Sequence, residues 1–199
     1  MKRDINLLIL IQQQKAALRF AGSALCKPSA GFTLIELLIT IVIASALMVV
    51  AVPSFVQFQK NSRLSDTVSS FVSAANTARA SAMKTGRQAL LVPNDNAIGW
   101  NSGWYVYIDA DFDETFDSGE EVVSRHEAIN TDILFSTPSA NSLSGSDRYL
   151  LFNGSGYPRM KSGAFGAATL NMSNSLRTTS FVISPAGGVR TCAAGSTGC

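Results

Sequence analysis

The sequence predicts an α+β protein in which one long N-terminal hydrophobic α-helix packs on an antiparallel β-sheet domain. Residues 32–52 form an apolar run in which Glu36 is the only ionisable residue, and helical spacing of apolar residues continues beyond it. From residue 87 onward, short runs of strand-forming residues alternate with Gly, Asn, Asp, Ser and Pro. A chain of 199 residues is long enough for one such domain with its own core.

The apolar run has the length of a membrane span. Its 21 residues reach about 31 Å as a helix, close to the thickness of a bilayer's hydrocarbon core. Five basic residues and one acidic residue precede the run, which places the N-terminus in the cytoplasm. After residue 31 the chain holds 11 basic and 13 acidic side chains. We therefore expect a single-pass protein whose slightly acidic C-terminal domain lies on the other side of the membrane.

The junction before this span differs from a secretory signal peptide, in which a small-residue cleavage site follows the apolar stretch. Here Ala30 and Gly31 precede the apolar stretch, and no such site follows it. A plain membrane anchor is the simplest alternative. Against that alternative stands Glu36, because a carboxylate inside an apolar segment is unfavourable unless a partner neutralises it.

The segment GFTLIELL, from Gly31 to Leu38, resembles the processing and assembly motif of type IV prepilins and type II secretion pseudopilins. This resemblance implies that a prepilin peptidase cleaves between Gly31 and Phe32 and methylates the new N-terminal Phe32. It also implies that Glu36, the fifth residue of the mature chain, pairs with the N-terminal amine of a neighbouring subunit in a filament. The chain is then held in the bacterial inner membrane with its C-terminal domain in the periplasm.

The resemblance also defines the expected organisation of the chain. The leader is longer than is usual in this family, and a true start at Leu18 or Leu25 would shorten it without changing the cleavage site. The predicted parts are a prepilin leader at 1–31, a transmembrane and assembly helix at 32–52, an amphipathic continuation of the helix at 53–86 and a periplasmic antiparallel β domain at 87–199.

Beyond the span, Pro53 removes one backbone donor and is expected to bend or loosen the helix, and related pilins have a proline at a similar depth. Gly86 is the expected end of the helix. An apolar stripe predicts the face that packs on the sheet, and it consists of Phe55, Phe58, Leu64, Val68, Phe71, Val72, Ala75, Ala78 and Ala82. The opposite, polar face consists of Gln59, Arg63, Asp66, Asn76, Arg79 and Lys84.

Eight strands are expected in the β domain, each bounded by turn-forming residues. They cover residues 88–92, 104–108, 121–125, 133–136, 149–152, 167–171, 179–183 and 189–192.

Within this domain, four segments resemble the minor pseudopilin H and FimT group: residues 103–109, 117–120, 152–158 and 183–192. Members of that group are minor pilins or pseudopilins, structural subunits that help to start or cap a type IV pilus or a type II secretion pseudopilus. The resemblance implies three kinds of partner: the prepilin peptidase, other major and minor pilins or pseudopilins, and the inner-membrane assembly platform.

DNA binding is an alternative function, because some FimT-like members bind DNA through a Gly-Arg-x-Arg element near the C-terminus. In this chain the corresponding residues are Gly187 to Arg190, so the first arginine is missing. Losing one phosphate contact weakens binding and lowers its salt dependence. Arg177 would compensate only if the fold brings it close to Arg190.

A calcium-binding, membrane-anchored periplasmic module is the second alternative. The acidic stretch after the second predicted strand has the ligand spacing of an EF-hand loop. Glu114, however, stands where that loop requires glycine, and the flanks are predicted strands. A solvated hairpin explains the same residues without a cation. The candidate ligands are Asp109, Asp111, Asp113, Asp117 and Glu120, with Thr115 at the remaining position.

No catalytic function is expected. The only histidine, His126, follows a predicted strand and has no serine or cysteine placed beside it by a nucleophile motif. No cofactor motif is present apart from the acidic loop. In an oxidising periplasm, Cys192 and Cys199 are expected to form a disulfide across a short loop, in preference to two free thiols or a zinc site.

Overall fold

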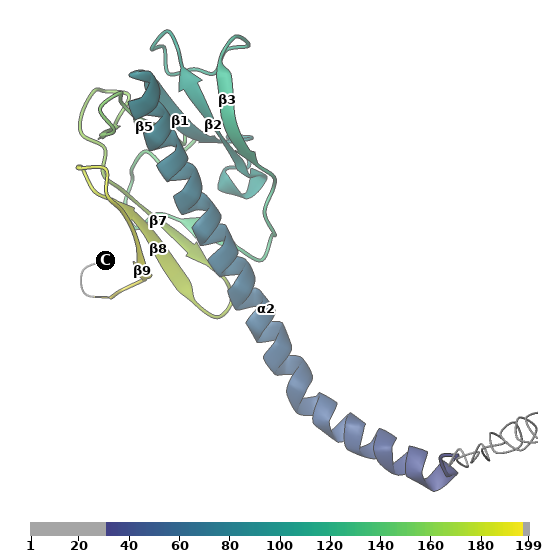
Figure 1. The fold of residues 1–199 in the computed structure, drawn as a ribbon. Coiled ribbons are helices and arrows are strands. Elements are labelled where there is room, and N and C mark those ends of the chain that lie inside the picture. Colours follow the sequence, from purple (N-terminus) through teal and green to yellow (C-terminus); the bar gives the residue numbers. More distant parts are fainter. Residues whose placement is uncertain (1–30, 197–199) are drawn as a thin grey trace, which may run out of the picture. The chain divides into compact units, whose positions relative to one another are not determined.

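The computed structural model describes residues 31–196. The chain divides into two compact units, Met1–Leu47 and Met48–Cys199, and helix α2 (Leu34–Thr85) supplies residues to both of them. In the second unit the helix lies against two antiparallel sheets (Figure 1). The predicted class, a long helix packed on an antiparallel β domain, is confirmed.

Helix α2 has clear start and stop signals. The backbone N–H of Glu36 donates to Thr33 Oγ1 at 3.3 Å, and the N–H of Leu37 donates to the Thr33 carbonyl at 3.1 Å, so Thr33 caps the first turn. At the other end, Gly86 has a φ of 69°, the left-handed conformation that commonly ends a helix. Pro53 lies inside the helix. Helical structure therefore continues through the proline.

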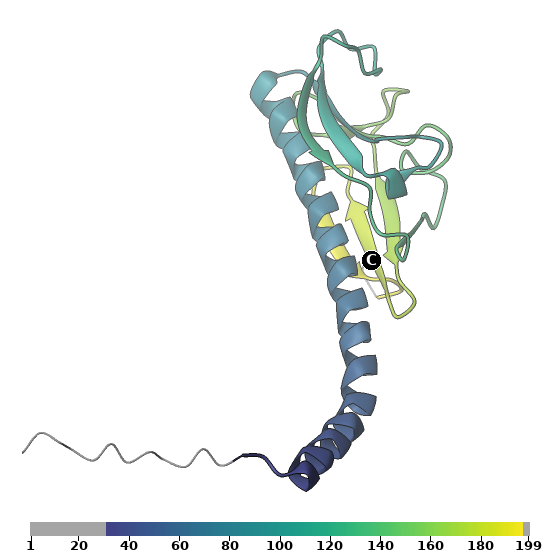
Figure 2. The ribbon, with the colours of Figure 1, turned by 90° about the vertical axis from the view of Figure 1, so that its right-hand side faces the viewer.

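The first sheet has the strand order β3-β2-β1-β5-β6, and the second has the order β4-β7-β8-β9. Every neighbouring pair is antiparallel. Figure 2 shows α2 running along both sheets on one side of the domain. The strands are β1 (Gln88–Pro93), β2 (Trp104–Asp109), β3 (Glu121–His126), β4 (Leu134–Ser136), β5 (Leu150–Phe152), β6 (Pro158–Arg159), β7 (Ala168–Ser173), β8 (Thr178–Ile183) and β9 (Val189–Ala193).

All eight predicted strands are present, and two short elements were missed. These are the 3-10 turn η1 (Trp100–Ser102) and the two-residue strand β6, which pairs with β5. Both are too short to show a periodic pattern. The division into two sheets was not predicted either, since it depends on which strands pair and not on where strands occur.

The buried face of the helix begins later than the stripe predicts. Phe55 and Phe58 were expected to pack on the sheet, but they are 59% and 67% exposed, and Leu64 is the first buried residue. The strands reach only the part of the helix beyond that point. Phe55 and Phe58 thus belong with the exposed apolar surface that precedes the domain.

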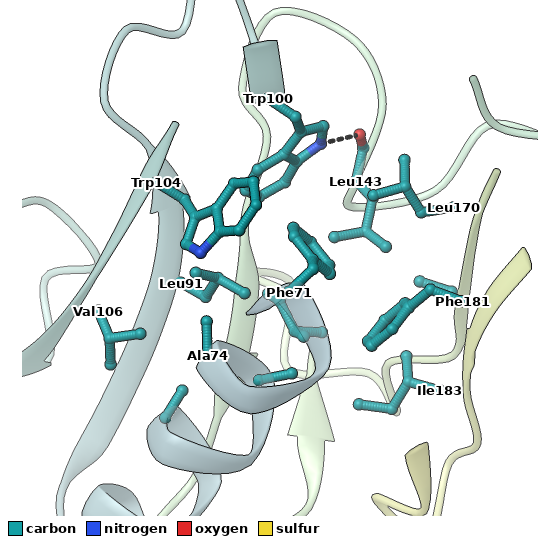
Figure 3. Packing of buried hydrophobic residues seen from close by; sticks show 14 of the residues in the cluster. Phe71, Ala74, Leu91, Trp100, Trp104, Val106, Leu143, Leu170, Phe181 and Ile183 are labelled. Carbon is teal, nitrogen blue, oxygen red and sulfur yellow. Dashed lines mark hydrogen bonds between the residues drawn. The ribbon is translucent and has the colours of Figure 1, made fainter. Parts of the chain in front are cut away.

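One aromatic side chain connects the helix to both sheets. The ring of Phe71 makes edge-on contacts with Trp100, Trp104 and Phe181, with ring centroids 5.0 to 5.1 Å apart (Figure 3). Trp104 belongs to β2 of the first sheet, and Phe181 belongs to β8 of the second. The Trp100 indole N–H donates to the Leu143 carbonyl at 3.0 Å, so its polar atom is satisfied in the core.

Two glycine-containing turns pack on the last turns of the helix. A Cβ at Gly154 would lie 2.4 Å from the Gly86 carbonyl oxygen, and one at Gly187 would lie 2.6 Å from the Gly156 carbonyl oxygen, so no larger residue fits at either position. Arg79, predicted on the polar face, is instead partly buried and donates from Nη1 to the Gly187 carbonyl at 2.7 Å. Both turns belong to segments on which the family resemblance rests.

Replacing Phe71 with alanine is expected to destabilise the domain by about 3–5 kcal/mol, because it removes a fully buried ring and its three aromatic contacts. Phe58→Ala is the matched control on the exposed part of the helix, with an expected change within about 0.5 kcal/mol. Denaturant unfolding of the detergent-solubilised chain, followed by tryptophan fluorescence, measures both. Equal effects of the two variants would contradict the assigned core.

Candidate functional site

The residues at the predicted processing junction are accessible. Phe32 is 77% exposed, and Thr33 and Glu36 stand at the spacing of a capping box at the start of α2. A carboxylate in the first helical turn also interacts favourably with the helix dipole. The start of the helix therefore tolerates Glu36 locally, while the side chain stays available for a partner outside the chain.

Apolar side chains cover the first half of α2 and face outward. Within the described residues, this is the helix long and apolar enough to cross a membrane, and its most apolar 18-residue window has a mean hydropathy of 2.7 with none of that window buried. The hydroxyl group of Thr40 donates to the Leu37 carbonyl at 2.7 Å, and that of Ser45 donates to the Val42 carbonyl at 2.8 Å. Their polar atoms are therefore satisfied without water, as lipid requires.

The acidic stretch forms the loop between β2 and β3, and two of its carboxylates organise the backbone. Asp109 is fully buried, and its two oxygens accept hydrogen bonds from the N–H groups of Phe112 at 2.7 Å and Glu114 at 3.0 Å. Glu120 accepts from the N–H groups of Ala110 at 2.8 Å and Asp117 at 3.1 Å. These hydrogen bonds explain both carboxylates as loop-forming residues.

The loop also brings candidate cation ligands together. Carboxylate oxygens of Asp109, Asp111 and Glu120 lie within 4.8 Å of one another, and so do those of Asp111, Asp113 and Asp117. Glu114, where an EF-hand has glycine, adopts a left-handed φ of 64°. The required sharp turn thus forms without glycine. The flanking elements are strands, as predicted, and calcium binding remains a prediction.

An aromatic residue holds the loop on the outer face of the first sheet. The ring of Phe116 contacts Tyr105 and Tyr107 edge-on, at centroid distances of 5.4 and 5.2 Å. Burial raises the pKa of the Tyr107 hydroxyl, and the neighbouring Asp109 charge raises it further. Burial likewise raises the pKa of Glu114, and Lys161 opposes that shift. The loop is therefore a packed element with a partly desolvated carboxyl group.

The residues predicted for DNA binding lie apart. Arg190 is exposed on β9 and pairs with Val182 of β8. Arg177 directly precedes β8, and the strand places it about 16 Å from Val182. Arg177 also donates from Nη2 to the Asn61 carbonyl at 3.0 Å and to Ser65 Oγ at 2.5 Å. The structure does not bring the two arginines together, so Arg177 does not replace the missing arginine of the Gly-Arg-x-Arg element.

Cys192 and His126 have structural and not catalytic contacts. Cys192 is disulfide-bonded, but Cys199 lies outside the described residues, so the pairing between them stays a prediction. His126 stacks on Trp104 with ring centroids 4.4 Å apart, and its Nδ1 lies 2.8 Å from the Glu127 carbonyl oxygen. The histidine therefore packs on the edge of the core, a contact that its place at a strand end did not indicate.

The acidic loop can be tested by comparing two of its aspartates. Asp109→Ala leaves two backbone N–H groups without their acceptor and is expected to lower the free energy of unfolding by about 1–3 kcal/mol in the absence of calcium. Asp111→Ala removes an exposed carboxylate and is expected to leave stability unchanged under the same conditions. Thermal unfolding with a chelator and with added calcium measures both. A calcium-dependent rise in stability that Asp111→Ala abolishes would establish the metal site.

The raised pKa of Glu114 predicts a pH effect on stability. Because the folded state favours the protonated carboxyl, this group's contribution is most favourable at low pH and is lost as the pH rises through the raised pKa. As the pH rises from about 4 to about 7, the free energy of unfolding of Glu114→Gln should therefore increase relative to that of the parent chain. Urea unfolding at both pH values checks this, and a parallel response of the two proteins would contradict it.

Comparisons with known proteins bear on both parts of the chain. The family model described as type II transport protein GspH matches residues 67–187, and the prokaryotic N-terminal methylation motif matches residues 26–52. Two crystal structures of the type IV minor pilin FimU from Pseudomonas aeruginosa, strain PAO1, resemble the chain at 14% identity. For the first structure the TM-score is 0.46, and the match covers 67% of this chain and 88% of the FimU chain. For the second the TM-score is 0.47, and the match covers 66% of this chain and 90% of the FimU chain. No curated protein matches the chain.

The GspH match spans more than half of the chain, including most of the buried part of α2 and most of both sheets. The methylation motif contains the junction at Gly31 and most of the exposed apolar part of the helix. The GspH family consists of structural pilins and not of enzymes. The chain belongs to the GspH family and is a minor pilin or pseudopilin.

Proposed function

We propose that the mature chain starts or caps a filament, either a type IV pilus or a type II secretion pseudopilus, after cleavage between Gly31 and Phe32 and methylation of Phe32. The observation that carries the proposal is the single carboxylate, Glu36, in the first turn of a helix that bears no other charge before Lys60. Assembly would proceed with the prepilin peptidase, the inner-membrane platform and other pilins or pseudopilins as partners.

The chemistry of Glu36 supports this mechanism. A charge inside an apolar surface is unfavourable unless an opposite charge neutralises it. Cleavage before Phe32 creates a new amine at the start of the same helix, so identical or related subunits each carry one cation and one carboxylate. Pairing between neighbours neutralises both charges and favours one axial register, while the exposed apolar residues of α2 supply lateral packing.

The proposed location is the inner membrane, with the β domain in the periplasm. The basic residues before the span favour a cytoplasmic N-terminus, and the disulfide at Cys192 is compatible with an oxidising compartment. The chain would stay there as a single-pass protein until it enters a filament. The match to the GspH family supports the proposed role as a minor subunit that starts or caps the filament.

Replacing Glu36 with glutamine tests the pairing. This change keeps the size of the side chain and removes its charge, so we expect processing and membrane insertion to continue while co-purification with other pilin subunits falls at least tenfold. Asp66→Asn, an exposed carboxylate further along the same helix, is the matched control and should have no effect. Normal incorporation of Glu36→Gln into filaments would contradict the pairing.

Deleting the gene tests the role at the filament end. A subunit that starts filaments should, when absent, reduce the number of filaments per cell at least severalfold without changing their length. Electron microscopy of deletion and complemented strains measures both quantities. Filaments of normal number but altered length would argue against initiation.

A further inference from the structure

The turn between β7 and β8 lies against the helix just after its apolar part (Figure 1). Asn174 donates from its amide to the Lys60 carbonyl at 2.9 Å, and Arg177 donates to the Asn61 carbonyl at 3.0 Å. Lys60 in turn donates from Nζ to Ser175 Oγ at 3.3 Å. These three hydrogen bonds hold the turn at the level of residues 60–61 of the helix.

Apolar side chains are exposed at this level. Leu176 is 46% exposed in the turn, and Phe55 and Phe58 are exposed on the helix immediately before Lys60. Leu134, 63% exposed, lies on β4 and pairs with Ser173 at the start of the same turn. The end of the domain that continues into the membrane helix is thus partly apolar.

The length of the uncharged helical segment gives the depth of this turn in a membrane. Between Glu36 and Lys60 no residue is charged, and the 22 residues from Leu37 to Phe58 measure about 33 Å as a helix. The hydrocarbon core accounts for about 30 Å, and the headgroup layer adds several ångströms on each side. Lys60, and with it the β7–β8 turn, therefore falls within the headgroup layer.

Charge is distributed unevenly between the two ends of the domain. Lys60, Arg63 and Arg177 lie near the turn, where Asp132 pairs with Arg63 at 3.4 Å. The acidic loop has seven carboxylates between residues 109 and 121. It lies at the end of the domain where α2 ends, since Arg87, just after the helix, donates to the Ala110 carbonyl. Figure 2 shows the β2–β3 loop at the end of the domain remote from the β7–β8 turn.

We propose that the β7–β8 turn, with Leu176, Lys60 and Arg177, is a membrane-surface contact that binds the anionic headgroups of phospholipids. Cations near an anionic surface are attracted to it, and a leucine at the boundary gains by leaving water. The acidic loop is repelled by the same surface. The contact would keep the domain's acidic end away from the bilayer before assembly. It rests on the membrane anchoring of the chain and not on its role at a filament end.

Fluorescence quenching in vesicles tests this contact. The full chain carrying Leu176→Trp is reconstituted into phosphatidylcholine vesicles containing phosphatidylglycerol, with brominated acyl chains as the quencher. The parent chain gives the background, because its tryptophans, Trp100 and Trp104, are buried. Phe112→Trp, at an exposed aromatic position in the acidic loop, is the matched control. We expect quenching at position 176 and none at position 112.

The charge dependence separates the possible sources of quenching. In the Leu176→Trp chain, a second change, Lys60→Gln, should lower the ratio of membrane-bound to unbound β7–β8 turns by up to about fivefold. Lys84→Gln, which changes an exposed lysine in the last helical turn, should leave this ratio unchanged. Equal quenching at both positions, or none at either, would overturn the proposal. So would quenching that persists in pure phosphatidylcholine and ignores salt. Burial of position 176 only when other pilin subunits are co-reconstituted would assign the surface to a protein partner instead.

Discussion

The packing of the β domain depends on the contact between Phe71 and three aromatic rings drawn from both sheets. Its edge-on geometry with Trp100, Trp104 and Phe181 places one helix residue where β2, η1 and β8 converge. On the same face, the helix presents alanines, including Ala75, Ala78 and Ala82, none of which is exposed. Small side chains allow the strands to lie close to the helix, and the single large ring then fills the space between the sheets.

The same helix has to satisfy two solvents. Up to Phe58 its apolar side chains are exposed all round, which suits lipid or the packed helices of a filament, and from Leu64 onward only one face is apolar and buried. The change occurs near Lys60, where the first charge after Glu36 appears. The β7–β8 turn binds the helix at this point, so the boundary between the two environments coincides with the edge of the folded domain.

Much of this arrangement was predictable from local sequence patterns. The apolar run, the helix end at Gly86 and eight strands each have a periodicity or a turn signal within a few residues. What could not be predicted depends on contacts between distant residues. Phe55 and Phe58 belong to the same predicted apolar stripe as Phe71. Only the extent of the sheets decides that Phe55 and Phe58 stay exposed. The contact between Arg79 and the Gly187 carbonyl likewise joins positions 108 residues apart.

The site residues divide in the same way. The junction at Gly31 and the carboxylate of Glu36 could be predicted from a short motif, because their chemistry depends on neighbouring residues in the chain, and both roles stay predictions. The role of Asp109 was missed, since an EF-hand spacing suggests a ligand, whereas its burial and its two backbone hydrogen bonds show a loop-forming residue. The separation of Arg177 from Arg190 depends on strand register, which single-sequence patterns do not determine.

The proposed assembly function requires that the chain is processed as a prepilin, and the intact mass of the protein purified from its native membrane measures that processing. In cells with the prepilin peptidase, we expect a chain that begins at Phe32 and carries one added methyl group. In cells without the peptidase, the uncleaved precursor should accumulate. An uncleaved N-terminus in the presence of the peptidase would show that the chain is not processed as a prepilin and would leave a membrane-anchored domain without an assembly function.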